Sequence, residues 1–152
     1  MGRRVSAANS WNALAVPKTD SEPHRRTRRD HATENAEDYV EAIAEIEAAS
    51  ETCRLVDLAR RFAVTHVTAN RIVARLTKEG LVETQPYQPI TLTRKGRLLA
   101  TRCRKRHEIV FRFLRCIGVD EKTAAIDAEG IEHHVSPSTL ELFHQFAERA
   151  ES

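Results

Sequence analysis

Aromatic residues, cysteines and long apolar runs are all scarce in this sequence of 152 residues. With aromatic residues at 5%, a core has to depend on aliphatic packing between helices. No apolar run approaches the ~20 residues of a membrane-spanning helix, and the N-terminus has arginines but lacks the apolar stretch of a secretory signal. Three widely spaced cysteines do not make a disulfide framework, so we interpret them as small buried hydrophobic residues. We therefore expect a cytoplasmic protein with no membrane association.

Charge is abundant but unevenly divided along the chain, although the net charge is only +2. Residues 32–53 carry seven acidic side chains and no lysine or arginine, whereas residues 54–115 carry fifteen basic and four acidic side chains. Residues 116–152 are acidic again, with eight acidic and two basic side chains. A basic middle suits a polyanion such as DNA, and acidic flanks suit a bound cation. Exposure on a solvated helix face is the simpler explanation for any one of these charges. It explains less well why whole segments carry charges of one sign.

Apolar spacing predicts a mainly α-helical chain whose first folded domain is a winged helix-turn-helix over residues 34–96. Residues 1–33 show no sustained period and are expected to form a disordered basic leader. Within the domain, a helix, a short helix, a turn, a third helix and a two-stranded wing follow one another, as is typical of winged helix-turn-helix proteins. The helices are predicted at residues 35–49, 55–62 and 66–79, and the strands at residues 81–84 and 90–93.

The second predicted domain, residues 97–152, is helical and is expected to bind metal and to form a dimer. A long basic helix over residues 97–117 is followed by a helix over residues 120–134. Ser136 and Pro137 occupy the capping and first positions of a last helix, which runs to about residue 149.

The third predicted helix, residues 66–79, has the features of a DNA-recognition helix, whose N-terminal residues meet base edges in the major groove. Its apolar residues Ile72, Val73 and Leu76 would face the core and leave the polar face free. Hydroxyl, methyl, amide and guanidinium groups on that face can contact base edges or phosphates. A protein-interaction module is the alternative. The predicted DNA-binding residues are Thr65, His66, Val67, Thr68, Asn70 and Arg71.

Three predicted helices carry oxygen or imidazole groups at spacings that suit a metal site. The first helix has two carboxylates three residues apart, and a later helix has two carboxylates and an imidazole at positions i, i+3 and i+4, so each set shares one face. Like charges repel, and a divalent cation would remove that penalty. Such ligands suit Mn²⁺ or Fe²⁺ better than Zn²⁺, although each set alone is more typical of an exposed helix face. The candidate ligands are Asp38, Glu41, His107, Glu129, Glu132 and His133.

At these residues the sequence resembles the diphtheria-toxin-repressor family of metal-dependent repressors, most closely its manganese-transport-regulator branch. The match runs from about residue 35 to 149. Its most specific parts are RHEIV and DAEGIEHHVS, whereas the winged-helix part is generic. The segments that carry it are EDYVEAI, VTHVTANRIVARLTKEGLV, LTRKG, RHEIVFRFL and DAEGIEHHVS.

The resemblance implies a homodimeric repressor that binds two Mn²⁺ ions per subunit through the six candidate ligands and then binds a palindromic operator in double-stranded DNA. Genes for manganese uptake would be its targets. The iron-responsive branch typically has methionine where Asp38 stands and cysteine where Glu129 stands. Oxygen ligands at both positions support Mn²⁺, with Fe²⁺ as the alternative. The SH3-like third domain of many iron-responsive members is not expected here.

Three alternatives to a manganese-dependent repressor are considered. One is a repressor of the same architecture that responds to iron or another metal, and a second is a winged-helix regulator that needs no metal. A third is a carboxylate-bridged di-metal enzyme, but the repeated Glu-x-x-His pairs of such bundles and the HExxH motif are both missing. We therefore expect a protein that is not an enzyme and has no small organic substrate.

Overall fold

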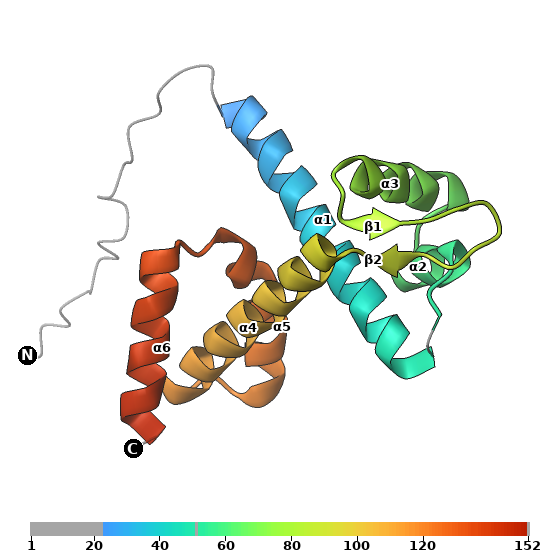
Figure 1. Cartoon of the computed structure of the whole chain (residues 1–152). Coiled ribbons are helices and arrows are strands. Elements are labelled where there is room, and N and C mark those ends of the chain that lie inside the picture. The colour runs from blue at the N-terminus through green and yellow to red at the C-terminus, as the bar shows by residue number, and fades with distance from the viewer. Residues whose placement is uncertain (1–22, 51, 152) are drawn as a thin grey trace, which may run out of the picture.

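The computed structural model describes residues 23–50 and 52–151, and this part of the chain is built mainly from helices (Figure 1). None of its helices combines the length and apolar character needed to cross a membrane. The elements in chain order are α1 (Pro23–Ser50), α2 (Leu55–Arg61), α3 (His66–Lys78), β1 (Val82–Glu83), β2 (Thr91–Leu92), α4 (Arg94–Cys116), α5 (Glu121–Ile131), the 3₁₀ helix η2 (Glu132–His134) and α6 (Pro137–Glu151).

The order α1, α2, α3 and a two-stranded wing confirms the predicted winged helix-turn-helix. Thr65 caps α3 as expected, because its hydroxyl accepts a hydrogen bond from the Thr68 backbone N–H at 3.2 Å. The strands pair antiparallel, and Cys53 adds an isolated bridge to Ile90. Each strand has two residues instead of the predicted four. The second strand is preceded by Pro89, which has no backbone N–H to donate to a ladder.

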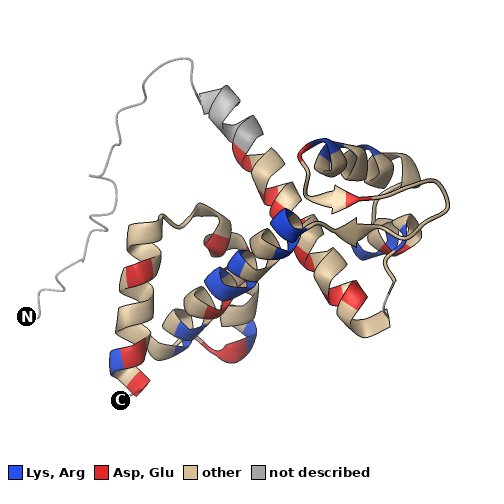
Figure 2. Ribbon diagram, viewed as in Figure 1, with Lys and Arg blue, Asp and Glu red and all other residues tan. Residues whose placement is uncertain are grey.

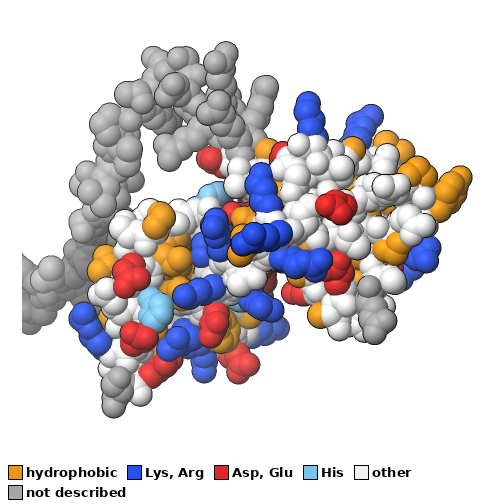
Figure 3. Space-filling model, in the orientation of Figure 1, with side chains coloured by type: hydrophobic (Ala, Val, Ile, Leu, Met, Phe, Trp, Pro, Cys, Tyr) orange, Lys and Arg blue, Asp and Glu red, His pale blue; other side chains and the backbone are white. Residues whose placement is uncertain are grey.

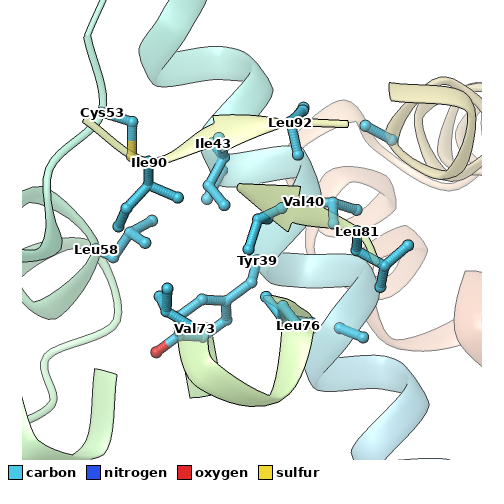
Figure 4. Close-up of a cluster of buried hydrophobic side chains, with 14 residues drawn as sticks. Tyr39, Val40, Ile43, Cys53, Leu58, Val73, Leu76, Leu81, Ile90 and Leu92 are labelled. Atoms are coloured by element: carbon cyan, nitrogen blue, oxygen red, sulfur yellow. The ribbon is translucent and has the colours of Figure 1, made fainter. Parts of the chain in front are cut away.

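The core of this domain lies where α1 crosses α2, α3 and the wing (Figure 4). Tyr39 and Ile43 of α1 are buried against Leu58 and Leu76. The ring of Tyr39 stacks on Phe62 with centroids 4.2 Å apart, and its buried hydroxyl has no hydrogen-bond partner among the residues that the structure describes. The helix α1 is therefore the central packing element of this domain.

The helix α4 joins the wing to the rest of the chain. Thr93 caps it, accepting a hydrogen bond from the Gly96 N–H at 3.0 Å. A Cβ atom at Gly96 would lie only 2.0 Å from the carbonyl oxygen of Leu81, so the first turn of α4 can approach the wing only with glycine there. The helix starts three residues before the predicted residue 97, because the sequence prediction treated Gly96 as part of the preceding loop.

A second core lies between α4, α5 and α6, where Val110 and Leu114 meet Ala124 and Ala128. At its edge the ring of Phe113 stacks on Phe143, with centroids 3.9 Å apart and planes within 1°. The main difference from the predicted pattern lies between α5 and α6. The predicted helix over residues 120–134 ends at Ile131 and continues as the 3₁₀ helix η2.

The first helix starts much earlier than predicted. Residues 23–33, expected to belong to a disordered leader, form the first turns of α1, so that expectation was wrong for them. Ala32 is the only apolar residue between Pro23 and Asn35 apart from the proline, so this segment has no apolar period to detect. The Ala32 carbonyl accepts a hydrogen bond from Arg75 of α3 at 3.1 Å, which anchors the extension. Residues 1–22 of the predicted leader lie outside the described residues.

Candidate metal centre and DNA-binding face

All six predicted metal ligands line one cavity of about 510 Å³ beside the crossing of α1 and α4. This crossing brings together segments that are far apart in sequence (Figure 1). The acidic residues of α1 run along one side, and the basic helix α4 crosses them (Figure 2). The ligands come from α1 (Asp38 and Glu41), α4 (His107), α5 (Glu129) and η2 (Glu132 and His133).

The two imidazoles connect the carboxylates in a chain of ion pairs. His107 Nδ1 lies 2.9 Å from Glu132 Oε2 and 3.7 Å from Glu129 Oε1. His133 Nε2 lies 3.2 Å from Asp38 Oδ1 and 3.7 Å from Glu132 Oε1. Glu132 is therefore shared between both imidazoles and is the point at which side chains of α1, α4 and η2 converge.

Glu132 is also the most buried carboxylate of the cavity, with 1% of its surface exposed. Its Oε2 has no hydrogen-bond partner among the described residues, because the contact with His107 is not aligned as a hydrogen bond. Burial, opposed by the charge of His133 and reinforced by Glu129, raises the pKa of Glu132 to about 7. A buried oxygen without a donor is compensated well by a cation, so the residues present fit a divalent metal.

The surroundings of the cavity favour the protonated forms of its side chains. Burial and the nearby Glu132 and Glu129 carboxylates raise the pKa of Glu41 to about 7. Hydrogen bonds to Asp38 and Glu37 raise the pKa of His133 to about 10. Within residues 23–50 and 52–151, no three ligand-type side chains already surround a common point. Ligation by His133 Nε2 requires loss of its proton, so metal binding and proton release are linked at this cavity.

Sequence reasoning missed Glu37 and Arg106, which lie behind the cavity. Glu37 is 6% exposed, and its Oε2 accepts hydrogen bonds from His133 Nδ1 at 2.8 Å and from Arg106 Nη2 at 2.5 Å. The signal that could have revealed Glu37 is its position between Ala36 and Val40, on the buried stripe of α1. A carboxylate on such a stripe has to find buried partners.

Cys103, one turn before His107, is fully buried and does not line the cavity. Burial raises the pKa of its thiol to about 12, and the Glu37 and Glu41 carboxylates act in the same direction. The predicted packing role therefore agrees with its surroundings, because a thiolate ligand would require a much lower pKa.

The predicted reading face of α3 is open. Ala69, Val73 and Leu76 are buried in the domain, while the opposite side of the helix meets solvent. Val67 is 63% exposed, so its methyl groups are free to contact a thymine methyl group. All six predicted DNA-binding residues, Thr65, His66, Val67, Thr68, Asn70 and Arg71, are exposed.

Basic side chains gather over α4 on the face of the molecule in Figure 3, with further lysines and arginines toward the winged domain. Exposed Arg94, Lys95 and Arg97 begin this stretch at the wing, and exposed Arg102, Arg104 and Lys105 continue it. A winged-helix domain with an open polar recognition helix, joined to a helical domain with an acidic cavity, defines a DNA-binding regulator with a cation-binding domain.

Comparison with known families agrees with this class. Residues 31–90 match the iron dependent repressor N-terminal DNA binding domain, and residues 93–152 match the iron dependent repressor metal binding and dimerisation domain. The two matches cover most of the chain, so the protein belongs to the iron-dependent repressor family of transcriptional regulators.

Individual curated relatives are named as transcriptional regulators. The chain is 40% identical over 151 residues to the transcriptional regulator MntR of Escherichia coli O157:H7, which covers 98% of this chain and 97% of that protein. It is 36% identical over 109 residues to the HTH-type transcriptional regulator MntR of Bacillus subtilis (strain 168), covering 72% and 77%.

Solved structures show the same fold. The manganese regulator SloR superposes with a TM-score of 0.66 at 27% identity, covering 75% of this chain and 54% of that one. A structure titled manganese-dependent transcriptional repressor complex with manganese gives a TM-score of 0.64 at 27% identity, covering 76% and 52%. This chain spans about half the length of these two structures.

Proposed function

We propose that the protein is a cytoplasmic, manganese-dependent transcriptional repressor. Mn²⁺ would act as its co-repressor, and the controlled genes would be genes for manganese uptake. The observation that carries the proposal is the convergence of four carboxylates and two imidazoles from four elements on one cavity. Oxygen-rich ligand sets with some imidazole suit Mn²⁺. The names of the relatives, which include manganese regulators, support the same ion.

We assign all six cavity residues as ligands for two Mn²⁺ ions per subunit. The ions would supply positive charge beside Glu41 and Glu132, whose pKa values are raised to about 7 without it. Glu132, which lies within 3.7 Å of both imidazoles, would hold the metal together with His107 and His133. The deprotonated carboxylates of α1 and η2 would then be attracted to the same positive charge instead of repelling each other. This attraction would fix α1 against α4 and η2.

Ordering α1 would act directly on the DNA-binding domain. Tyr39, adjacent to Asp38, is packed into the core of that domain and stacks on Phe62 beyond α2. Arg75 of α3 donates to the Ala32 carbonyl of α1 at 3.1 Å. The position of the recognition helix is therefore tied to the helix that carries two proposed ligands, and a coupling free energy of about 1–3 kcal/mol is typical of such linkage.

A homodimer would present two recognition helices to a palindromic operator. The C-terminal domain exposes large apolar side chains that suit self-association. Two such helices about one DNA turn apart, ~34 Å, would read two half-sites. The exposed apolar residues include Ile117, Ile126, Leu142 and Phe146.

The test is DNA binding as a function of free Mn²⁺. Duplexes selected from a random pool with Mn²⁺ present would be titrated by fluorescence anisotropy, with Mn²⁺ set by a chelator buffer and with Fe²⁺ and Zn²⁺ in parallel. We expect tight binding with Mn²⁺ and loss of binding in excess chelator. Equal binding in chelator would make the protein a metal-independent regulator, and activation by Fe²⁺ or Zn²⁺ alone would assign another metal.

Two variants test whether the Mn²⁺ response depends on the cavity. Glu129→Ala and His133→Ala should remove the Mn²⁺ response while the circular dichroism spectrum stays helical. His144→Ala is the matched control, because His144 lies on α6, outside the cavity, and pairs with Glu148 at 3.4 Å. A normal Mn²⁺ response in both cavity variants would contradict the assignment.

A further inference from the structure

Glu37 lies behind the cavity, where three elements meet. It belongs to α1, but its Oε2 contacts Arg106 of α4 at 2.5 Å and His133 of η2 at 2.8 Å. Its side chain is 8% exposed, compared with 37% for its neighbour Asp38. Glu37 does not line the cavity, so it is separate from the proposed ligands.

Two nitrogen atoms from other elements face the buried carboxyl group of Glu37, Arg106 Nη2 and His133 Nδ1. Burial alone would raise the pKa of Glu37, but hydrogen bonds from His133 and Arg106 outweigh it and hold the pKa below its usual value. A guanidinium can only donate hydrogen bonds, so Glu37 Oε2 is an acceptor toward Arg106, and the same oxygen is placed to accept from the Nδ1–H of His133.

This contact determines which ring nitrogen of His133 is available. With Nδ1 bound to Glu37 on one side, Nε2 points to the other, where Asp38 Oδ1 lies 3.2 Å away and the cavity begins. Histidine ligands in metalloproteins commonly donate their second ring N–H to a carboxylate, which fixes the ring and strengthens it as a ligand.

We infer that Glu37 is a positioning residue that orients His133 toward the metal cavity, and that Arg106 holds Glu37 in place. The inference rests on the proposed function, because it concerns how a proposed ligand is presented. It adds two residues that act without touching the ion, and it connects α1, α4 and η2 through one buried oxygen atom.

The experiment compares two carboxylates of the same helix. Glu37→Gln keeps the size of the side chain but removes its charge, and Glu45→Gln is the matched control. Glu45 also lines the cavity and is 60% exposed, but it pairs with Arg61 and contacts no proposed ligand. Free Mn²⁺ would be measured by electron paramagnetic resonance during titration of each folded protein. We expect the affinity for Mn²⁺ to fall ~10–100-fold in Glu37→Gln. It should fall less than ~3-fold in Glu45→Gln, because solvent screens the charge of Glu45 in the wild type.

A second measurement needs no metal. In chelator, the Nδ1–H proton of His133 should give a slowly exchanging downfield NMR signal in the wild type and in Glu45→Gln. The signal should be lost in Glu37→Gln. Unchanged Mn²⁺ affinity, or an unchanged His133 signal, in folded Glu37→Gln would overturn the inference.

Arg106→Gln provides an independent variant that leaves Glu37 in place. It should weaken Mn²⁺ binding, and the double variant with Glu37→Gln should bind no more weakly than Glu37→Gln alone, because Arg106 acts through Glu37. Additive losses would overturn the role given to Arg106. A wild type that binds no Mn²⁺ would instead refute the proposed function, and the metal-free His133 signal would still report the Glu37 contact.

Discussion

Replacing Glu132 by glutamine should stabilise the metal-free protein at alkaline pH. The carboxyl group is 1% exposed, and its pKa is raised from 4.5 to about 7. A folded-state pKa above the unfolded value means that the native state binds the proton more tightly. The stability of the fold must therefore fall as the pH rises from the unfolded pKa through the folded pKa. Glutamine has the shape of the protonated acid and stays neutral, so it avoids this loss.

The magnitude follows from the pKa. A rise from 4.5 to about 7 corresponds to about 3 kcal/mol of unfolding free energy, of which about 2 kcal/mol is lost between about pH 5.5 and about pH 8. At about pH 8 we expect Glu132→Gln to exceed the wild type by up to about 3 kcal/mol, and by much less near pH 5.5. Both proteins keep a further decline from Glu41 and His133, because the pKa of each is also raised by folding.

The assay is urea unfolding followed by circular dichroism, in excess chelator at both pH values. Glu129→Gln is the control, since this side chain is 73% exposed and its loss should change stability by less than ~0.5 kcal/mol. Adding Mn²⁺ at about pH 8 should stabilise the wild type but not Glu132→Gln. The reasoning is refuted if Glu132→Gln is less stable than the wild type at about pH 8 in chelator.

Three further substitutions test the fold and the DNA face. Gly96→Ala should cost about 3 kcal/mol or more in thermal unfolding, because the added Cβ meets a backbone carbonyl. Gly130→Ala, whose Cβ meets nothing within 4 Å among the described residues, should be neutral or stabilising by up to ~1 kcal/mol. Equal effects of the two substitutions would contradict the close packing at Gly96. Tyr39→Phe removes a buried hydroxyl without a partner and should cost less than ~1 kcal/mol by urea unfolding, whereas a larger loss would mean that the hydroxyl is bonded. Arg71→Ala should weaken binding to selected DNA by ~1–3 kcal/mol in anisotropy titrations, and more than Lys78→Ala in the last turn of α3; the reverse order would argue against the recognition-helix assignment.

The winged domain could be predicted because its apolar residues repeat at helical spacing and its turns are marked by capping residues and prolines. Thr65 and Gly80 bound α3 in the sequence as they do in the structure. The start of α1 could not be predicted in this way, because residues 23–33 have no apolar period. In the structure Arg75 of α3 ties this segment to the domain through the Ala32 carbonyl.

The cavity was predictable in its members but not in its internal contacts. Carboxylates and imidazoles at helical spacing indicated shared faces, and those faces meet where α1 crosses α4. The change from α5 to a 3₁₀ helix at Glu132 and the role of Glu37 could not be read from spacing. Both depend on packing between segments up to 96 residues apart.

The most direct test of the central claim is a crystal structure of the Mn²⁺-loaded protein with anomalous data at the manganese edge. The account predicts anomalous peaks inside the cavity, within coordination distance of Asp38, Glu132 and His133, with Glu37 still bound to the far side of the His133 ring. Peaks only elsewhere on the chain, with the cavity holding its present ion pairs unchanged, would contradict it.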